Sequence, residues 1–139
     1  MKTTDELLKI LKNTRDIDSF LNENRDWFLN MDLCGYLNEL SEKKSLRPTD
    51  VIADSNLNNI YVYKILSGER VPGRDKLLCL CFGMHMSIEE AQLALRLAGH
   101  SPLYVKVRRD SIIIFALNNG ASLMDCNETL YDLGEDILE

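Results

Sequence analysis

The chain has 139 residues, of which 45% are hydrophobic and 27% charged, and its net charge is −6. This composition is that of a soluble globular protein, with one compact domain or one domain that carries a small helical extension. No apolar run approaches the roughly 20 residues of a membrane span, and the first residues, MKTTDELLKILKN, are amphipathic rather than a signal core. We therefore expect a cytoplasmic protein without membrane contact.

The beginning of the chain is predicted to be helical, as is almost all of the rest, so the predicted fold class is all-α. Thr4 is a candidate N-cap for a first amphipathic helix within residues 3–13. A second amphipathic stretch covers residues 16–31 and includes Trp27. Residues 1–30 are therefore predicted to form an N-terminal helical extension.

Five helices are predicted within residues 31–99. Apolar residues recur there at helical intervals. Pro48 suits the first turn of the second helix, where no backbone N–H is needed. The expected helices are residues 32–44, 47–55, 58–66, 76–84 and 87–99.

An internal repeat lies in the second half of the chain. Residues 74–99 align without gaps on residues 109–134, at an offset of 35. Each copy has an Arg-Asp start, an apolar run, a serine N-cap followed three residues later by an acidic residue, and a final glycine. Each copy is therefore predicted to be a helical hairpin, which assigns the isoleucine run 112–114 to a helix although it alone would suit a strand. Residues 100–139 thus form a predicted C-terminal helical hairpin, with residues 100–107 as its connector.

The stretch NLNNIYVYKILSGERVPGRDK contains a short helix and then a turn with a small residue, a glycine, a basic residue and a proline. Together with the short helix before it, this stretch resembles the lambda-repressor-like (Xre-type) helix-turn-helix family. The resemblance covers residues 31–99, about half of the chain. It implies a five-helix DNA-binding domain whose third helix enters the major groove, and hence a sequence-specific transcriptional regulator.

The third predicted helix has one face for packing and others for DNA. Val62, Ile65 and Leu66 can pack inward. Asparagine can pair with adenine, an apolar side chain can meet a thymine methyl, and lysine can reach guanine or phosphate. The candidate base contacts are Asn58, Asn59, Ile60, Tyr63 and Lys64. The candidate phosphate contacts around this helix are Lys43, Lys44, Arg47, Thr49, Ser67, Arg70 and Arg74.

The distribution of charge agrees with such a role. Residues 1–42 carry a net charge of −4, residues 43–109 a net of +5, and residues 110–139 a net of −7. A basic centre can bind phosphates locally because salt limits the reach of each charge to roughly 10 Å. The alternative is that the acidic ends are ordinary solvated helical faces.

Neither catalysis nor a cofactor has support in the sequence. No P-loop, no GxGxxG, no HExxH and no GxSxG pattern occurs. The four cysteines, Cys34, Cys79, Cys81 and Cys126, form no CxxC pair, and the two histidines stand in no metal-ligand spacing. We expect buried, reduced packing thiols, with metal or redox roles as the weaker alternative, and neither enzymatic activity nor a bound cofactor or metal.

Two functions remain open. A regulator of this type reads two half-sites of double-stranded DNA, so we expect a homodimer that forms through residues 1–30 and 100–139. The alternative is a helical adaptor that kept the scaffold without DNA binding. Ile60 and Tyr63 make the presumed reading face apolar and aromatic, and Glu69 places a negative charge in the turn. The acidic N- or C-terminal segments would then also be surfaces for a protein partner.

Overall fold

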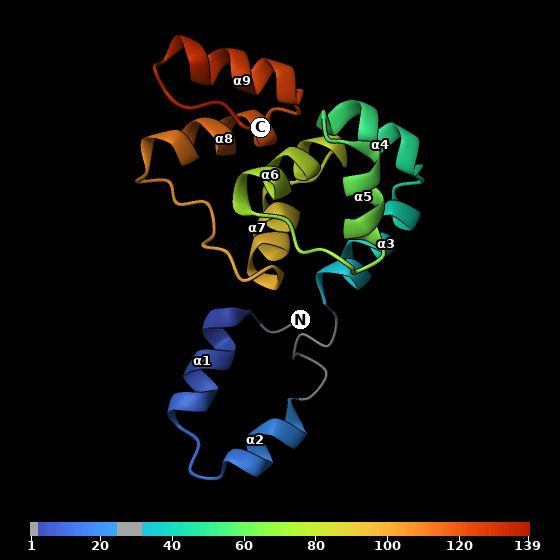
Figure 1. Ribbon diagram of the computed structural model, residues 1–139. Coiled ribbons are helices and arrows are strands. Elements are labelled where there is room, and N and C mark those ends of the chain that lie inside the picture. Colours follow the sequence, from blue (N-terminus) through green and yellow to red (C-terminus); the bar gives the residue numbers. More distant parts are fainter. Residues whose placement is uncertain (1–2, 25–31) are drawn as a thin grey trace. The chain divides into compact units, whose positions relative to one another are not determined.

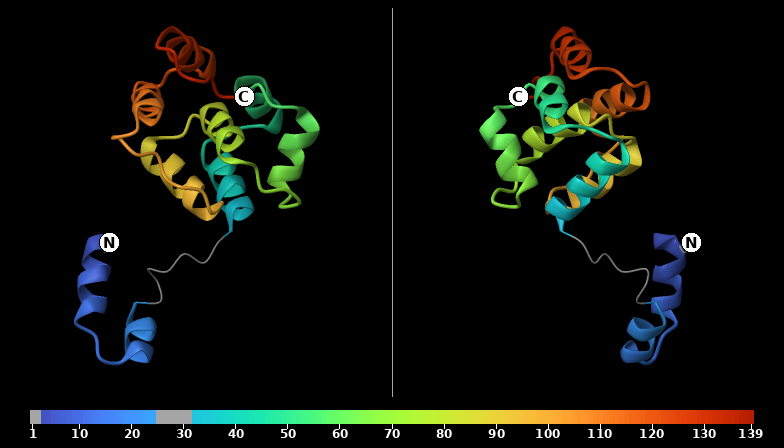
Figure 2. Two further views of the ribbon diagram at one scale, coloured as in Figure 1. Left: turned by 60° about the vertical axis from the view of Figure 1, so that its left-hand side comes forward. Right: turned by 90° about the vertical axis from the view of Figure 1, so that its right-hand side faces the viewer.

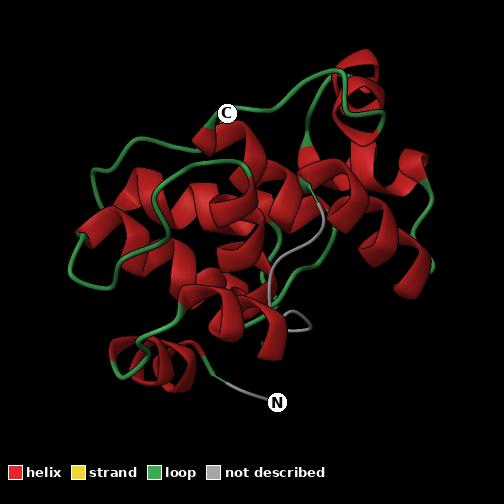
Figure 3. Ribbon diagram, turned by 90° about the horizontal axis from the view of Figure 1, so that it is seen from below, coloured by secondary structure: helices red, strands yellow, loops and turns green. Residues whose placement is uncertain are grey.

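The computed structural model describes residues 3–24 and 32–139, and the chain divides into two compact units, residues 1–30 and 31–139. All regular secondary structure in the described residues is helical, which confirms the predicted all-α class (Figure 3). The end of the second amphipathic stretch, with Trp27, lies outside the described residues. Within the described ranges, no helix has the length and apolar character needed to cross a bilayer.

The described residues of the first unit, 3–24, form two short helices, α1 (Thr4–Lys12) and α2 (Ile17–Glu23). The N-cap of α1 is Thr3, whose Oγ1 accepts a hydrogen bond from the backbone N–H of Glu6 at 3.1 Å. The prediction of Thr4 as the cap was therefore wrong by one residue. Two adjacent threonines have the same capping chemistry, so composition alone does not choose between them.

Seven helices make up the second unit, and Figures 1 and 2 show them in chain order. The five helices predicted for residues 31–99 are confirmed to within two residues at each end, and the isoleucine run 112–114 is helical, as the repeat predicted. The helices are α3 (Leu33–Lys43), α4 (Pro48–Ser55), α5 (Asn59–Leu66), α6 (Arg74–Gly83), α7 (Ile88–Leu97), α8 (Arg108–Asn118) and α9 (Leu123–Asp132).

The centre of this unit is α6, which is buried from Leu77 to Gly83 because α4, α7 and α9 all pack against it. A helix covered on several sides needs apolar residues around its whole circumference, which explains its unbroken apolar run. The close crossing of α6 with α4 requires a glycine at position 83. A Cβ atom there would lie 2.6 Å from the Cβ of Ser55 and 2.8 Å from the carbonyl oxygen of Val51.

The two hairpins of the repeat have the predicted helix ends. Ser87 and Ser122 are the N-caps of α7 and α9, and each Oγ accepts from the backbone N–H three residues later, at 3.1 and 3.0 Å. Gly99 and Gly134 follow the same helices and both have a φ of +79°. This left-handed conformation is easily adopted only by glycine. The predicted helical-hairpin form of both copies is thereby confirmed.

The two hairpins also pair with each other through the Arg-Asp dipeptides that begin them. Arg74 Nη2 lies 2.9 Å from Asp110 Oδ2, and Arg109 Nη2 lies 2.9 Å from Asp75 Oδ2. In the same sense, α6 packs against α9 and α7 packs against α8. The contacts that the first hairpin makes to the second are therefore the same as those that the second makes to the first. This is the contact pattern of units related by a two-fold axis.

Each arginine also binds the segment that follows its own hairpin. Arg74 donates to the carbonyl oxygens of residues 101–102 at 3.0 and 3.2 Å. Arg109 donates to those of residues 136–137 at 2.9 and 3.2 Å. One guanidinium thus connects its own hairpin to the aspartate of the other, which its fork of donors permits.

The structural repeat continues beyond the aligned residues. The amide of Gln92 donates to the carbonyl of Leu103 at 2.8 Å and accepts from its N–H at 2.7 Å. Asn127 makes the same pair of bonds with Leu138, at 2.9 and 2.7 Å. Both leucines are buried. Each hairpin therefore ends in a short tail that is fixed by one arginine and one side-chain amide.

The four cysteine thiols are free. Cys79, Cys81 and Cys126 are buried, as predicted, and burial raises the pKa of their thiols to about 11, 12 and 11. The prediction of burial was wrong for Cys34, which is only half-buried and whose Sγ donates to the carbonyl of Leu66 at 3.1 Å. Since the thiolate is the reactive form, we expect an alkylating reagent at about pH 8 to modify Cys34 first and the other three only after unfolding. Peptide mass spectrometry measures this order, and early labelling of Cys81 in the folded protein would contradict it.

Candidate nucleic-acid interface

A three-residue turn joins α4 to α5. After Ser55, Asn56 takes a left-handed conformation with a φ of +55°, Leu57 is buried, and Asn58 is the N-cap of α5. Asparagine is one of the few residues besides glycine that visits this conformation readily. The two short helices α4 and α5 are thus joined by a tight turn.

The inward and outward faces of α5 are those predicted. Val62 and Ile65 are buried, Leu66 is half-buried, and α3 and α4 pack against this helix. On the outer side, Ile60 is 62% exposed and Tyr63 is 50% exposed. The outer face of α5 therefore offers one large aliphatic and one aromatic side chain to a partner.

The two asparagines at the start of α5 are engaged with its backbone. Asn58 Oδ1 accepts from the N–H groups of Ile60 and Tyr61 at 2.9 and 3.4 Å, and Asn59 Oδ1 accepts from Ile60 at 2.8 Å. Bidentate pairing with adenine uses both the oxygen and the NH2 group of the amide. Asn58 is needed as the cap, whereas Asn59 can turn toward a base while Asn58 still satisfies the N–H of Ile60.

A cleft of about 380 Å³ beside α5 is lined by three cations. Lys64 comes from α5, Arg70 from the following loop and Lys76 from the first turn of α6. No carboxylate lines the cleft, and none of the three cations is in an ion pair with any of the described residues. The cleft therefore has an unneutralised positive charge directly beside the outer face of α5.

Lys76 is absent from the predicted contacts. It follows directly after the Arg74-Asp75 dipeptide, of which Arg74 was predicted as a phosphate contact. The structure separates these neighbours, because Lys76 is exposed and lines the cleft whereas Arg74 is bound to Asp110. They are two positions apart in sequence, so they lie on different faces of α6. Once the buried face of α6 is known, helical periodicity predicts which of the two is exposed.

Three of the predicted phosphate contacts are bound to carboxylates of the protein itself. Arg74 pairs with Asp110, and Arg47 pairs with Asp50 at 3.2 Å. The third is Lys44, which pairs with Glu90 at 2.9 Å. A phosphate would have to displace these carboxylates, so these cations contribute less to an anion site than their sequence positions suggested.

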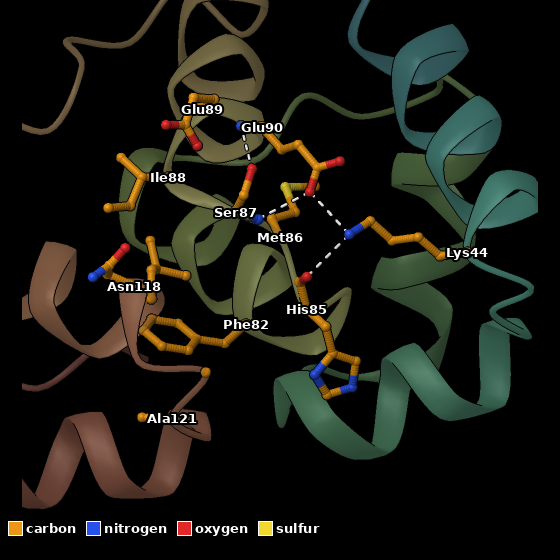
Figure 4. A pocket seen from close by; sticks show the side chains of 12 residues that line it. Lys44, Phe82, His85, Met86, Ser87, Ile88, Glu89, Glu90, Asn118 and Ala121 are labelled. Carbon is orange, nitrogen blue, oxygen red and sulfur yellow. Dashed lines mark hydrogen bonds and ion pairs between the residues drawn. The ribbon is translucent and has the colours of Figure 1, made fainter.

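Lys44 connects α3 to the start of α7. Its ammonium group lies 2.9 Å from Glu90 Oε1 and donates to the carbonyl of His85 at 3.1 Å (Figure 4). Glu90 also accepts from the N–H of Ser87 at 2.9 Å. Burial of the Glu90 carboxyl raises its pKa, but the hydrogen bonds from Ser87 and Lys44 outweigh burial, and the pKa lies below its ordinary value. The Glu90 carboxylate therefore stays charged at neutral pH and neutralises Lys44.

The remaining predicted phosphate contacts lie around α4 and α5. Lys43, Thr49 and Arg70 are exposed, and no ion pair within the described ranges involves Lys43 or Arg70. Ser67 is exposed as the C-cap of α5, and its hydroxyl donates to the carbonyl of Lys64 at 3.0 Å. These side chains are accessible to a polyanion, with Arg70 already in the cleft.

The side chains of the candidate site can donate and accept hydrogen bonds and can contact apolar and anionic groups. In the part of the chain that the structure describes, no group of three or more His, Cys, Asp or Glu side chains is placed to hold a metal ion. Its chemistry is that of amide, aromatic and cationic groups on and beside a short exposed helix. Comparisons of the chain with protein-family models, with curated proteins and with solved structures found no match.

Proposed function

We propose that the protein is a sequence-specific DNA-binding regulator that inserts α5 into the major groove. The observation that carries this proposal is the cleft in which Lys64, Arg70 and Lys76 lie together without a carboxylate. DNA presents one negative charge per 1.7 Å of its axis, so unneutralised cations beside an exposed helix favour it as the ligand. The overall charge of −6 does not oppose this, because screening makes the local field decisive.

The side chains divide into two groups by their reach. Asn59, Ile60 and Tyr63 on the outer face of α5 would meet base edges, where an amide and apolar groups distinguish the base pairs. Lys64 and Arg70 would meet phosphates beside the groove, together with Lys76, the third cation of the same cleft. In this proposal a homodimer supplies two copies of α5 to two half-sites about one helical turn apart.

Asn59→Ala and Lys64→Ala test the two groups separately. We expect Asn59→Ala to weaken binding to a selected site by roughly 1–3 kcal/mol and to relax the choice of one base pair. We expect Lys64→Ala to weaken binding to all sequences and to lower the salt slope by about 0.9, the contribution of one phosphate contact. Gel-shift titrations at several salt concentrations, on a site selected from a random pool, measure both effects.

Asn118→Ala is the matched control, because Asn118 is exposed at the end of α8 and does not line the cleft. It should leave affinity and salt slope unchanged. Asn59 and Asn118 are exposed and Lys64 is half-buried. Melting temperatures of all three variants show whether any loss reflects unfolding, since substitutions outside the core usually change stability by about 0.5 kcal/mol or less. Full affinity and full salt dependence in both α5 variants would remove this helix as the reading element.

A protein adaptor is the second candidate. Ile60, Tyr63 and Val71 are each at least half exposed, and Lys44 and Arg74 are neutralised within the protein. Aromatic and aliphatic side chains of this kind are enriched in protein–protein interfaces. The salt slope separates the two functions, because a DNA-binding protein loses affinity steeply as salt rises, whereas an adaptor shows no DNA affinity to lose.

A further inference from the structure

We propose that the α8–α9 hairpin exchanges between two copies of the chain, so that the hairpin of each copy docks on α6 and α7 of the other. The exchange specifies how the homodimer of the proposed function would form, and to that extent it rests on the proposed function. Its evidence is separate, because it comes from the contacts between the hairpins and from the segment that joins them.

The contacts between the hairpins do not depend on which chain supplies each half. They consist of the pairs Arg74–Asp110 and Arg109–Asp75 and of the packing of α6 on α9 and α7 on α8. A second copy presents the same side chains in the same arrangement. Exchange of an identical element therefore keeps every one of these interactions, which makes it a low-cost route to a dimer.

The connector between the hairpins has a defined hinge. Residues up to Leu103 are bound to the first hairpin through Arg74 and Gln92. Residues 104–107 have no hydrogen bond to that hairpin. Their bonds run within the segment and to the start of α8, where Asp110 accepts from the N–H of Tyr104 at 3.0 Å and Ser111 donates to the carbonyl of Val105. Opening the hinge thus breaks few bonds, and four extended residues span roughly 13 Å.

The hinge is also apolar and exposed. Tyr104, Val105 and Val107 are 54%, 68% and 46% exposed. Aromatic and β-branched residues favour an extended backbone, which is the conformation that an open hinge needs. In an exchanged dimer the two hinges cross beside each other, so these side chains can cover one another. The exposed apolar surface in the single copy is therefore explained by a contact that only the dimer makes.

Two complementary charge variants test the exchange. Asp75→Lys places a cation opposite Arg109 of its own chain, and Arg109→Glu places a carboxylate opposite its own Asp75. In each variant alone, residues 75 and 109 therefore repel each other, whether the α8–α9 hairpin docks on its own chain or on a second copy of the same variant. In an exchanged dimer of one copy of each, the substituted residues form one attractive pair and the unsubstituted residues form the other.

We expect the two variants, unfolded together and refolded without DNA, to form a mixed dimer in about tenfold excess over either homodimer, as measured by native mass spectrometry. The chain with both substitutions is the control, because its own pair is restored and it should not select a partner. A statistical mixture, or monomers only, would overturn the proposal.

A second measurement covers the case in which a variant does not fold. The unsubstituted chain in 15N-labelled and unlabelled forms is refolded at increasing concentration, and a dimer of intermediate mass should grow with concentration. If only monomers form, the proposal is wrong whatever the variants do. Because no DNA is present, this failure leaves the assignment of α5 intact, and loss of DNA binding in the α5 variants leaves the exchange intact.

Discussion

Gly83→Ala is expected to lower the free energy of unfolding by about 1–3 kcal/mol. The added Cβ would lie 2.8 Å from the backbone oxygen of Val51 as well as 2.6 Å from the Cβ of Ser55, so rotation of a side chain cannot relieve the contact. The helix α4 must move away from α6, which loosens the packing of α4 and of α5 beside it. Urea denaturation followed by circular dichroism measures the change.

Gly73→Ala is the control for this substitution. Gly73 is the N-cap of α6, its φ of −64° suits any residue, and a Cβ there would meet no atom within 4 Å. Alanine is a poorer N-cap than glycine, so a loss below about 1 kcal/mol is expected. Equal losses in the two variants would show that the crossing of α4 and α6 is not the tight contact described above.

Removal of the three cations of the cleft is expected to have the largest effect on DNA binding. With Lys64, Arg70 and Lys76 all changed to glutamine, the slope of log affinity against log salt should become less steep by about 2.7, if each cation contacts one phosphate. At roughly 0.1 M salt this corresponds to a loss of affinity of about 100-fold or more. Fluorescence anisotropy over a range of salt concentrations measures the slope directly.

A second triple variant has the same change in net charge but leaves the cleft intact. Lys9, Arg96 and Lys106 are exposed, do not line the cleft and are in no ion pair with another described residue. Their replacement by glutamine should change the slope little, because none of the three lines the cleft. If both triple variants lose affinity equally, the binding surface is not the cleft beside α5.

The helices and their ends were predictable because their signals are local. Ser87 and Gly99 mark the limits of α7 by capping chemistry that needs no knowledge of the rest of the fold. The isoleucine run in α8 was assigned correctly only through its aligned partner in α6. The role of Asn58 as a cap was also within reach of the sequence, since asparagine before a helix is a strong N-cap signal.

The candidate site was less predictable because its charges are decided by contacts between distant segments. Arg74 and Asp110 are far apart in sequence, and the alignment of the repeat shows that the hairpins are equivalent without showing how they face each other. The exposure of Lys76 likewise follows from which side of α6 the other helices cover. Sequence reasoning therefore found the helix α5 and its polar entry, but assigned Arg74 and Lys44 to phosphate where the structure pairs them internally.

The reciprocal pairing of the hairpins also limits how the repeat can grow. In an open array, each unit binds the next by translation, and the last unit always has an unused surface for one more. Here Arg74 and Asp75 are both bound to the second hairpin, and Arg109 and Asp110 are both bound to the first. The repeat is thus saturated at two units, whether they come from one chain or from two. A third copy of the hairpin would find no unpaired Arg-Asp dipeptide to bind. Duplication of this hairpin therefore gives a closed pair rather than a superhelix.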